Sequence, residues 1–119
     1  MAAGAVHTLP KKERLSGRTD ISRLLDKGRY GIASCLKYCY LTGTGLPYGR
    51  ILVSVPKRHF KRAVKRNLLK RRIRESYRTR KELLAPGTDV MFIYQPKEIL
   101  SYPEICSAME TALKDISAE

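Results

Sequence analysis

The residues of this chain that could do chemistry are its arginines and lysines, and they are concentrated in one stretch. Residues 57–81 hold 13 Lys and Arg and a single acid, Glu75, so this window carries a net charge of +12 out of the +13 of the whole chain. Guanidinium and ammonium groups gathered in this way bind phosphates through charge-assisted hydrogen bonds. The pattern therefore predicts a surface that binds a polyanion, and a nucleic acid is the usual partner of such a surface.

An anionic membrane could attract the same cations. The sequence contains no lipidation motif, no signal-peptide pattern and no apolar run of membrane-spanning length. We therefore expect no membrane partner and a cytoplasmic location.

Chemistry other than anion binding has few candidates. The eleven acidic residues are scattered, and no pair has a spacing suited to two metal ions. No P-loop, GxGxxG or zinc motif is present, and Cys35, Cys39 and Cys106 are expected to be reduced, partly buried thiols. The sequence predicts a protein with no catalytic residue, no metal site and no bound cofactor, which would act by positioning a substrate or a catalytic partner.

The basic stretch is predicted to be a helix within the element order α-β-β-α-β-α. The expected elements are a short helix from Thr19, as N-cap, to Gly28, strands at 34–42, 50–55 and 89–94, the basic helix ending near Leu83 and Leu84, and a last helix after a Ser101–Glu104 capping box. The turn 43–49 favours antiparallel pairing of the first two strands. We predict one domain over residues 1–119, an α+β two-layer sandwich with a small central sheet, and a flexible basic tail at 1–13.

The basic helix divides into faces at about 100° per residue. An apolar stripe that can pack on the sheet consists of Leu69, Ile73, Tyr77 and Leu84. A polar face consists of Asn67, Lys70, Arg71, Arg74, Arg78 and Lys81. A charge run is usually just a solvated face, but cations of one sign at i, i+4 spacing repel one another, which favours an anionic partner. Tyr38 and Tyr40 share a strand face that is either core or a stacking platform for unpaired bases.

The segment AVKRNLLKRRIRE at 63–75 resembles the signature helix of the bacterial ribonuclease P protein component, roughly A-V-x-R-N-R-x-K-R-x-x-R-E. Leu68 departs from it, because the family usually has a second Arg there. The stretch from Arg14 to Gly28 and the strand RILVSVPKR are similar to two further family patterns, so the resemblance runs from about Arg14 to Ile116. Ile21 and Leu25 stand where many members have aromatic residues, and a Gly common before the helix is missing.

The resemblance implies a small protein subunit of a ribonucleoprotein endonuclease that removes the 5′ leader of precursor tRNA. The RNA subunit would be the catalyst and would use Mg²⁺, and the protein would be a monomer in a 1:1 complex. The basic helix would lie in a left-handed βαβ crossover and dock on the RNA subunit. A cleft between this helix and the sheet would hold the single-stranded leader.

Two sets of site residues follow from this resemblance. The expected contacts with the RNA subunit are Lys61, Arg62, Lys65, Arg66, Asn67, Lys70, Arg71, Arg74 and Arg78. The expected lining of the leader cleft is Ile21, Leu25, Tyr38, Tyr40, Ser54, Lys57 and Arg58. The alternatives are a ribosomal-type structural RNA-binding protein and an autonomous nuclease.

Overall fold

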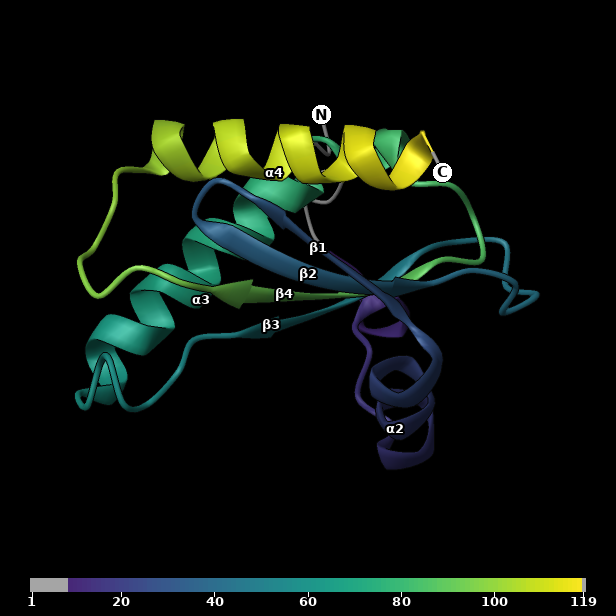
Figure 1. The fold of residues 1–119 in the computed structure, drawn as a ribbon, viewed down its shortest axis with the longest axis horizontal. Helices are drawn as coiled ribbons and strands as arrows, with labels where there is room; N and C mark the ends of the chain where they lie inside the picture. The colour runs from purple at the N-terminus through teal and green to yellow at the C-terminus, as the bar shows by residue number, and fades with distance from the viewer. Residues whose placement is uncertain (1–8, 119) are drawn as a thin grey trace.

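A four-stranded sheet separates two unequal helical layers in the computed structural model, which describes residues 9–118 (Figure 1). The elements are η1 (Lys11–Glu13), α2 (Arg18–Lys27), β1 (Arg29–Ala33), β2 (Leu36–Leu41), β3 (Arg50–Ser54), α3 (Ala63–Arg78), η2 (Lys81–Leu83), β4 (Asp89–Tyr94) and α4 (Tyr102–Ser117). Helices α3 and α4 lie together on one face of the sheet, and α2 lies on the other. The predicted α+β class is confirmed, with α2 placed outside the main two layers.

The strand order is β1-β2-β4-β3. Strands β3 and β4 pair in parallel, so α3 connects them as a βαβ crossover, whose left-handed sense stays a prediction. The predicted pairing of β2 with β3 is wrong, because β4 lies between them and pairs with both. Strand β4 takes this central place because its alternate side chains Val90, Phe92 and Tyr94 are fully buried, as suits a strand with neighbours on both sides.

Strand β1 was not predicted. It forms a hairpin with β2 through the two-residue turn Ser34–Cys35, in which Ser34 has a φ of 54°. A two-residue hairpin loop needs such a left-handed residue, which is usually Gly, Asn or Asp rather than Ser. Gly31 weakens the strand pattern but is required, because a Cβ there would lie 2.4 Å from the Tyr38 hydroxyl oxygen.

The main core lies between the sheet and the pair α3 and α4. The predicted apolar stripe of α3 is confirmed, since Leu69 and Ile73 are fully buried and Tyr77 is 1% exposed. Burial of each such side chain contributes roughly 1.5–3 kcal/mol. Because buried tyrosine loses the hydration of its ionised form, the pKa of Tyr77 is raised well above its ordinary value. The core therefore fixes which side of α3 faces solvent.

A smaller cluster on the opposite face fixes α2. Leu24 of α2 is buried there together with Leu15 and Cys39. Gly28 ends the helix as predicted, but its backbone is in the extended conformation (φ −73°, ψ 161°) rather than in the left-handed one. It has to be glycine because a Cβ would lie 2.4 Å from the Leu24 carbonyl oxygen and 2.6 Å from Cys39 Sγ. The helix begins two residues earlier than expected for Thr19 as N-cap, since Gly17 is the N-cap.

The remaining helix ends and the N-terminal segment also differ in part from expectation. Helix α3 stops at Arg78 and is followed by the separate short helix η2. The capping box of α4 is confirmed, because the Ser101 N–H donates to Glu104 Oε2 at 2.9 Å. The predicted tail is wrong over 9–13, where Leu9 and Glu13 are buried. Residues 1–8 lie outside the described residues.

Candidate RNA-binding surfaces

The residues predicted to contact the RNA subunit come from α3 and from the turn before it. Six of them are exposed: Lys61, Arg62, Lys65, Asn67, Arg71 and Arg74. The other three, Arg66, Lys70 and Arg78, are half-buried. The helix presents these groups outward because its opposite side is held in the core. Their contact with RNA stays a prediction.

Arg66 has a structural task in addition to its charge. Its Nη1 donates to the carbonyl oxygens of Phe60 at 2.7 Å and Lys61 at 2.8 Å. Phe60 is buried, with its ring 5.9 Å from that of Tyr94. Arg66 therefore braces the turn that carries Lys61 against the start of α3. Val64, in the first turn of α3, is 78% exposed.

A hollow of about 250 Å³ lies beside the exposed side of α3. It is lined by Leu9, Arg14, Arg71, Arg74, Glu75 and Arg78. The pKa of Arg74 is lowered first by its partial burial and then by the positive charge of Arg14. Sequence reasoning assigned no site role to Arg14. Its position directly before the apolar Leu15 could have indicated that the chain is anchored at this point.

Tyr38 and Tyr40 do not lie in the predicted leader cleft. Both are buried, at 7% and 6% exposure, in the core beneath α3 and α4. Alternation along β2 places them on the same side as the fully buried Leu36. The core side chains also fill the space between α3 and the sheet, so the prediction of a cleft there, with two stacking tyrosines, is wrong.

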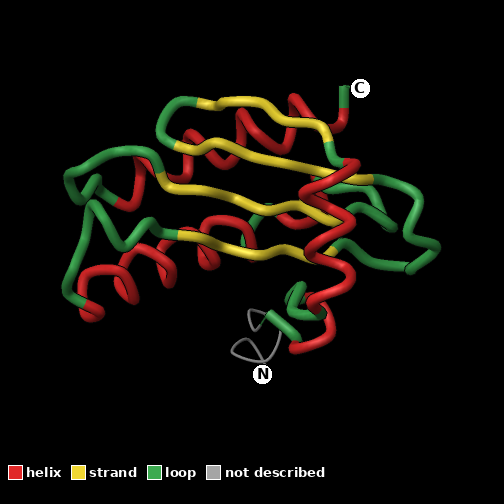
Figure 2. Tube along the Cα trace, turned by 60° about the horizontal axis from the view of Figure 1, so that its bottom comes forward, coloured by secondary structure: helices red, strands yellow, loops and turns green. Residues whose placement is uncertain are grey.

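The other face of the sheet is open along one row of cross-strand neighbours. The register places Ile32, Lys37, Ile93 and Ser54 side by side across β1, β2, β4 and β3. Ile32 is 67% exposed, and the other three are half-buried. Figure 2 shows why, because α2 crosses the strands at one end and leaves the rest of this face without a helix. We call these four residues the open row.

The predicted residues Ile21, Leu25 and Ser54 lie on this open face. Ile21 and Leu25 come from α2, where Leu25 is 42% exposed. Between α2 and the open row lies Tyr30, which is 52% exposed and donates its hydroxyl to the Leu25 carbonyl oxygen at 3.0 Å. Lys37 Nζ lies 5.5 Å from the Tyr30 ring centroid.

Lys57 and Arg58 are exposed in the turn after β3. This turn follows directly on Ser54, the last residue of β3 and the end of the open row. The structure therefore keeps Ile21, Leu25, Ser54, Lys57 and Arg58 as one candidate surface. Sequence reasoning missed Tyr30, Ile32 and Lys37, because it missed β1 and assigned the wrong face of β2.

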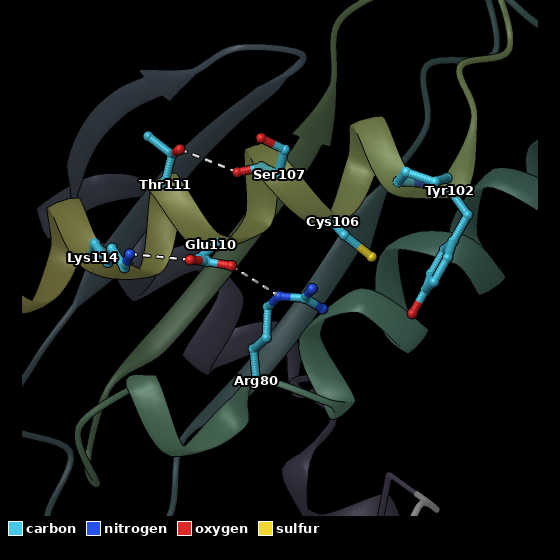
Figure 3. Close-up of a pocket in the computed structure, with 8 residues that line it drawn as sticks. Arg80, Tyr102, Cys106, Ser107, Glu110, Thr111 and Lys114 are labelled. Carbon is cyan, nitrogen blue, oxygen red and sulfur yellow. Dashed lines mark hydrogen bonds and ion pairs between the residues drawn. The ribbon is translucent and has the colours of Figure 1, made fainter.

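A hollow of about 500 Å³ between the end of α3 and α4 is less suited to an anion (Figure 3). Two of its cations are paired with one acid: Arg80 Nε lies 3.5 Å from Glu110 Oε2, and Lys114 Nζ lies 3.0 Å from Glu110 Oε1. These two cations lower the pKa of Glu110, Lys114 more strongly than Arg80. Cys106 points toward this hollow, and like Cys35 and Cys39 it is a free, buried thiol, as predicted.

Residues 9–118 contain neither a cluster of metal-binding side chains nor a membrane-spanning helix. No group of three or more His, Cys, Asp or Glu side chains in this range could hold a metal ion. No helix in the same range is both long and apolar enough to cross a bilayer. The cytoplasmic location stays a prediction.

Comparisons with known proteins agree on one family. The family model described as Ribonuclease P matches residues 9–117. The ribonuclease P protein component of Porphyromonas gingivalis ATCC 33277 is 41% identical over 86 residues, which cover 71% of this chain but only 63% of that protein's length. The component of Petrotoga mobilis is 42% identical over 94 residues, 79% of this chain and 76% of that protein.

A solved structure is similar over most of both chains. The RNase P protein of Staphylococcus aureus superposes with a TM-score of 0.77 at 26% identity, covering 87% of this chain and 94% of that one. Because the family model spans nearly the whole chain, this protein belongs to the Ribonuclease P family.

Proposed function

We propose that this chain is the protein subunit of ribonuclease P, which binds a catalytic RNA and the 5′ leader of precursor tRNA and assists endonucleolytic removal of that leader. The RNA subunit supplies the chemistry with Mg²⁺, and the protein supplies no catalytic residue. One copy of the protein serves one RNA. Membership of the Ribonuclease P family supports the role as protein subunit. The two surfaces of the chain support separate binding of the catalytic RNA and of the leader.

The observation that carries the proposal is the side of α3 that bears Asn67, Arg71 and Arg74. These three residues are exposed, whereas Leu69 and Ile73 on the opposite side are fully buried. Within α3 the only acid is Glu75, and it is ion-paired with Arg78. The other cations repel one another at i, i+3 and i+4 spacing, and RNA phosphates relieve that repulsion when they bind.

The open row suits a single-stranded leader. Unpaired bases stack on exposed aromatic rings, which contributes about 1–3 kcal/mol per base, and Tyr30 offers such a ring. Lys37 places a positive charge next to it for a backbone phosphate. Ile32 and Leu25 add apolar contact. The leader therefore binds the face opposite α4, beside α2 rather than between α3 and the sheet.

The choice of RNA partner is tested by competition. Labelled RNase P RNA is bound to the protein at physiological salt and competed with unlabelled RNase P RNA or with a ribosomal RNA fragment of equal length. We expect the ribosomal fragment to compete far more weakly, because non-specific binding rests on phosphate charge alone. Equal competition would favour the alternative of a ribosomal-type structural protein.

The leader surface is tested by reversing one charge. Lys37→Glu replaces an attraction by a repulsion, each worth up to about 1 kcal/mol at a surface. We expect the holoenzyme to bind leader-bearing precursor tRNA about tenfold more weakly, which corresponds to about 1.4 kcal/mol, and to bind mature tRNA unchanged. The measurement is the Kd of each RNA for the reconstituted holoenzyme.

Lys114→Glu is the matched control, because Lys114 is an exposed lysine of α4 on the opposite layer. It should leave both affinities unchanged. Equal weakening by the two variants would show a general charge effect and would remove the leader from the open row.

A further inference from the structure

The hollow beside α3 gathers four guanidinium groups around one acid. Arg71, Arg74 and Arg78 come from α3, and Arg14 comes from the N-terminal segment, 57 residues earlier in the chain than Arg71. Glu75 is the one acid in the lining. The lining therefore carries a formal charge of +3 around a space of about 250 Å³.

Arg14 is held in place by its neighbours. Its backbone forms a parallel bridge with Ile51 of β3, and the Leu15 N–H donates to the Ile51 carbonyl oxygen at 2.8 Å. Leu15 is 1% exposed and packs in the cluster beneath α2. On the other side, Glu13 accepts from Lys81 Nζ at 3.3 Å. The segment thus fixes an additional cation against α3, where a flexible tail would not.

Arg78 is incompletely satisfied. Its side chain is 15% exposed and forms an ion pair with Glu75. Its Nη1 is buried and has no hydrogen-bond partner among the described residues. Buried guanidinium donors are normally hydrogen-bonded, so a small shift of the Arg78 side chain toward the hollow would let this donor reach an acceptor there. Burial and then the positive charge of Arg14 also lower the pKa of Arg74.

We propose that Arg14, Arg71, Arg74 and Arg78 form a clamp for one phosphodiester group of the RNA subunit, in which Glu75 holds Arg78 until the phosphate arrives. The clamp rests on the proposed function, and it deepens that function by assigning one phosphate to residues from two distant parts of the chain. Arginine suits this task because its planar fork binds phosphate oxygens in pairs. A lysine at the same position keeps the positive charge but cannot form the pair of parallel hydrogen bonds with two phosphate oxygens.

The first experiment uses the RNA subunit and the full-length protein. The Kd of the complex between the RNA subunit and the protein is measured over a series of KCl concentrations. The proteins compared are the unchanged protein, Arg14→Ala, Arg14→Lys and Arg18→Ala. Arg18 is an exposed arginine at the start of α2 and controls for the loss of one surface charge. Circular dichroism melts confirm that each variant is folded.

We expect Arg14→Ala to weaken binding more than tenfold and Arg18→Ala less than threefold. Arg14→Lys should lose affinity while it keeps the salt slope of the unchanged protein, because the number of neutralised phosphates is the same. Equal behaviour of Arg14→Ala and Arg18→Ala, or full affinity in Arg14→Lys, would overturn the clamp.

A double-mutant cycle tests whether the arginines share one phosphate. Arg14→Ala and Arg78→Ala should be strongly non-additive, because either change alone already disrupts the same contact. Arg18→Ala combined with Arg78→Ala should be additive. Additivity in both pairs would overturn the shared site.

The second experiment needs no RNA subunit and separates the clamp from the proposed function. Inorganic phosphate is titrated into the protein alone, and the arginine Nε–H signals are followed by NMR. We expect the signals of the four clamp residues to shift along one saturable curve, which Arg14→Ala abolishes. Weak, linear shifts of all arginines alike would contradict the site.

Together, the two experiments distinguish a failure of the clamp from a failure of the proposed function. If the unchanged protein does not bind the RNA subunit but the four signals respond to phosphate, the proposed function fails and the anion site stands. If the protein binds the RNA subunit and Arg14→Ala is neutral in both experiments, the clamp fails and the proposed function stands.

Discussion

At the scale of single residues, Arg50 holds the open face together. Its Nε and Nη2 donate to the two carboxylate oxygens of Asp89 at 2.9 and 2.7 Å, and its Nη1 donates to Asp20 Oδ2 at 3.2 Å. These contacts raise the pKa of Arg50, chiefly through the hydrogen bonds that Arg50 donates to Asp89. Asp20 lies in the first turn of α2, so the guanidinium group joins α2 to the starts of β3 and β4.

Arg50→Ala should therefore lower the free energy of unfolding by about 3 kcal/mol, because it leaves the carboxylate of Asp89 buried without its partner. Asp89 is 3% exposed, so solvent cannot replace the lost hydrogen bonds. The measurement is equilibrium unfolding in urea, with the midpoint and slope compared with those of the unchanged protein.

Arg23→Ala is the matched control for Arg50→Ala. Arg23 also faces Asp20, at 3.9 Å, but its side chain is 55% exposed. Its loss should cost less than about 0.5 kcal/mol. Similar costs for the two variants would mean that the buried pair with Asp89 does not stabilise the fold.

Prediction from sequence succeeded for residues whose environment is local. The periodicity of α3 identified Leu69, Ile73 and Tyr77 as buried, and the three-residue spacing of Ser101 and Glu104 identified a cap. Both patterns depend on neighbours within one helix. The alternation of β2 also grouped Tyr38 with Tyr40 correctly, but alternation does not say which face the helices will cover.

At the scale of elements, one side of α3 stabilises the fold and the other side is the one that we propose binds RNA. Ile73→Ala should cost about 3 kcal/mol of unfolding free energy because it leaves a cavity in the core. Arg71→Ala should change stability by less than about 0.5 kcal/mol and should reduce the salt slope of RNA binding by about one unit. Urea unfolding and salt-dependent binding of the RNA subunit measure the two effects.

Arg72 and Arg66 provide internal comparisons for this separation. Arg72 Nη1 donates to the Leu100 carbonyl oxygen at 2.7 Å, and Arg66 braces the turn before the helix. Their substitution by Ala should affect unfolding as well as binding. If Arg71→Ala destabilised the protein as much as Ile73→Ala, the assignment of faces on α3 would be wrong.

Elements whose partners are distant in sequence were predicted less well. Strand β4 inserts between β2 and β3, although β2 and β3 are consecutive in the chain. The short loop between β2 and β3 favoured a hairpin of these two strands. They are separated because the apolar strand β4 is buried between them and pairs with both. Residues 9–13 were assigned to a tail because the residues that anchor the chain directly after them, Arg14 and Leu15, pair with Ile51 of β3, which lies far along the chain.

At the scale of the whole molecule, charge and fold assign different tasks to different sides. The basic segment 57–81 carries +12 of the net charge of +13, and the core buries Leu69 and Ile73 of α3 and leaves Arg71 and Arg74 exposed. The open row lies on the other face of the sheet, away from the end of the strands that α2 crosses (Figure 2). A protein arranged in this way can contact a large RNA and a single strand at once, with the edge strand β3 and its following turn between the two surfaces.

The central claim is that this protein assists an RNA catalyst and does not cleave by itself. The most direct test is cleavage of precursor tRNA at low Mg²⁺ by the protein alone, by the cognate RNA subunit alone and by both together. We predict slow cleavage with RNA alone, several-fold faster cleavage at the same 5′ position with both, and no cleavage with protein alone. Cleavage by the protein alone, or no stimulation of the RNA, would contradict it.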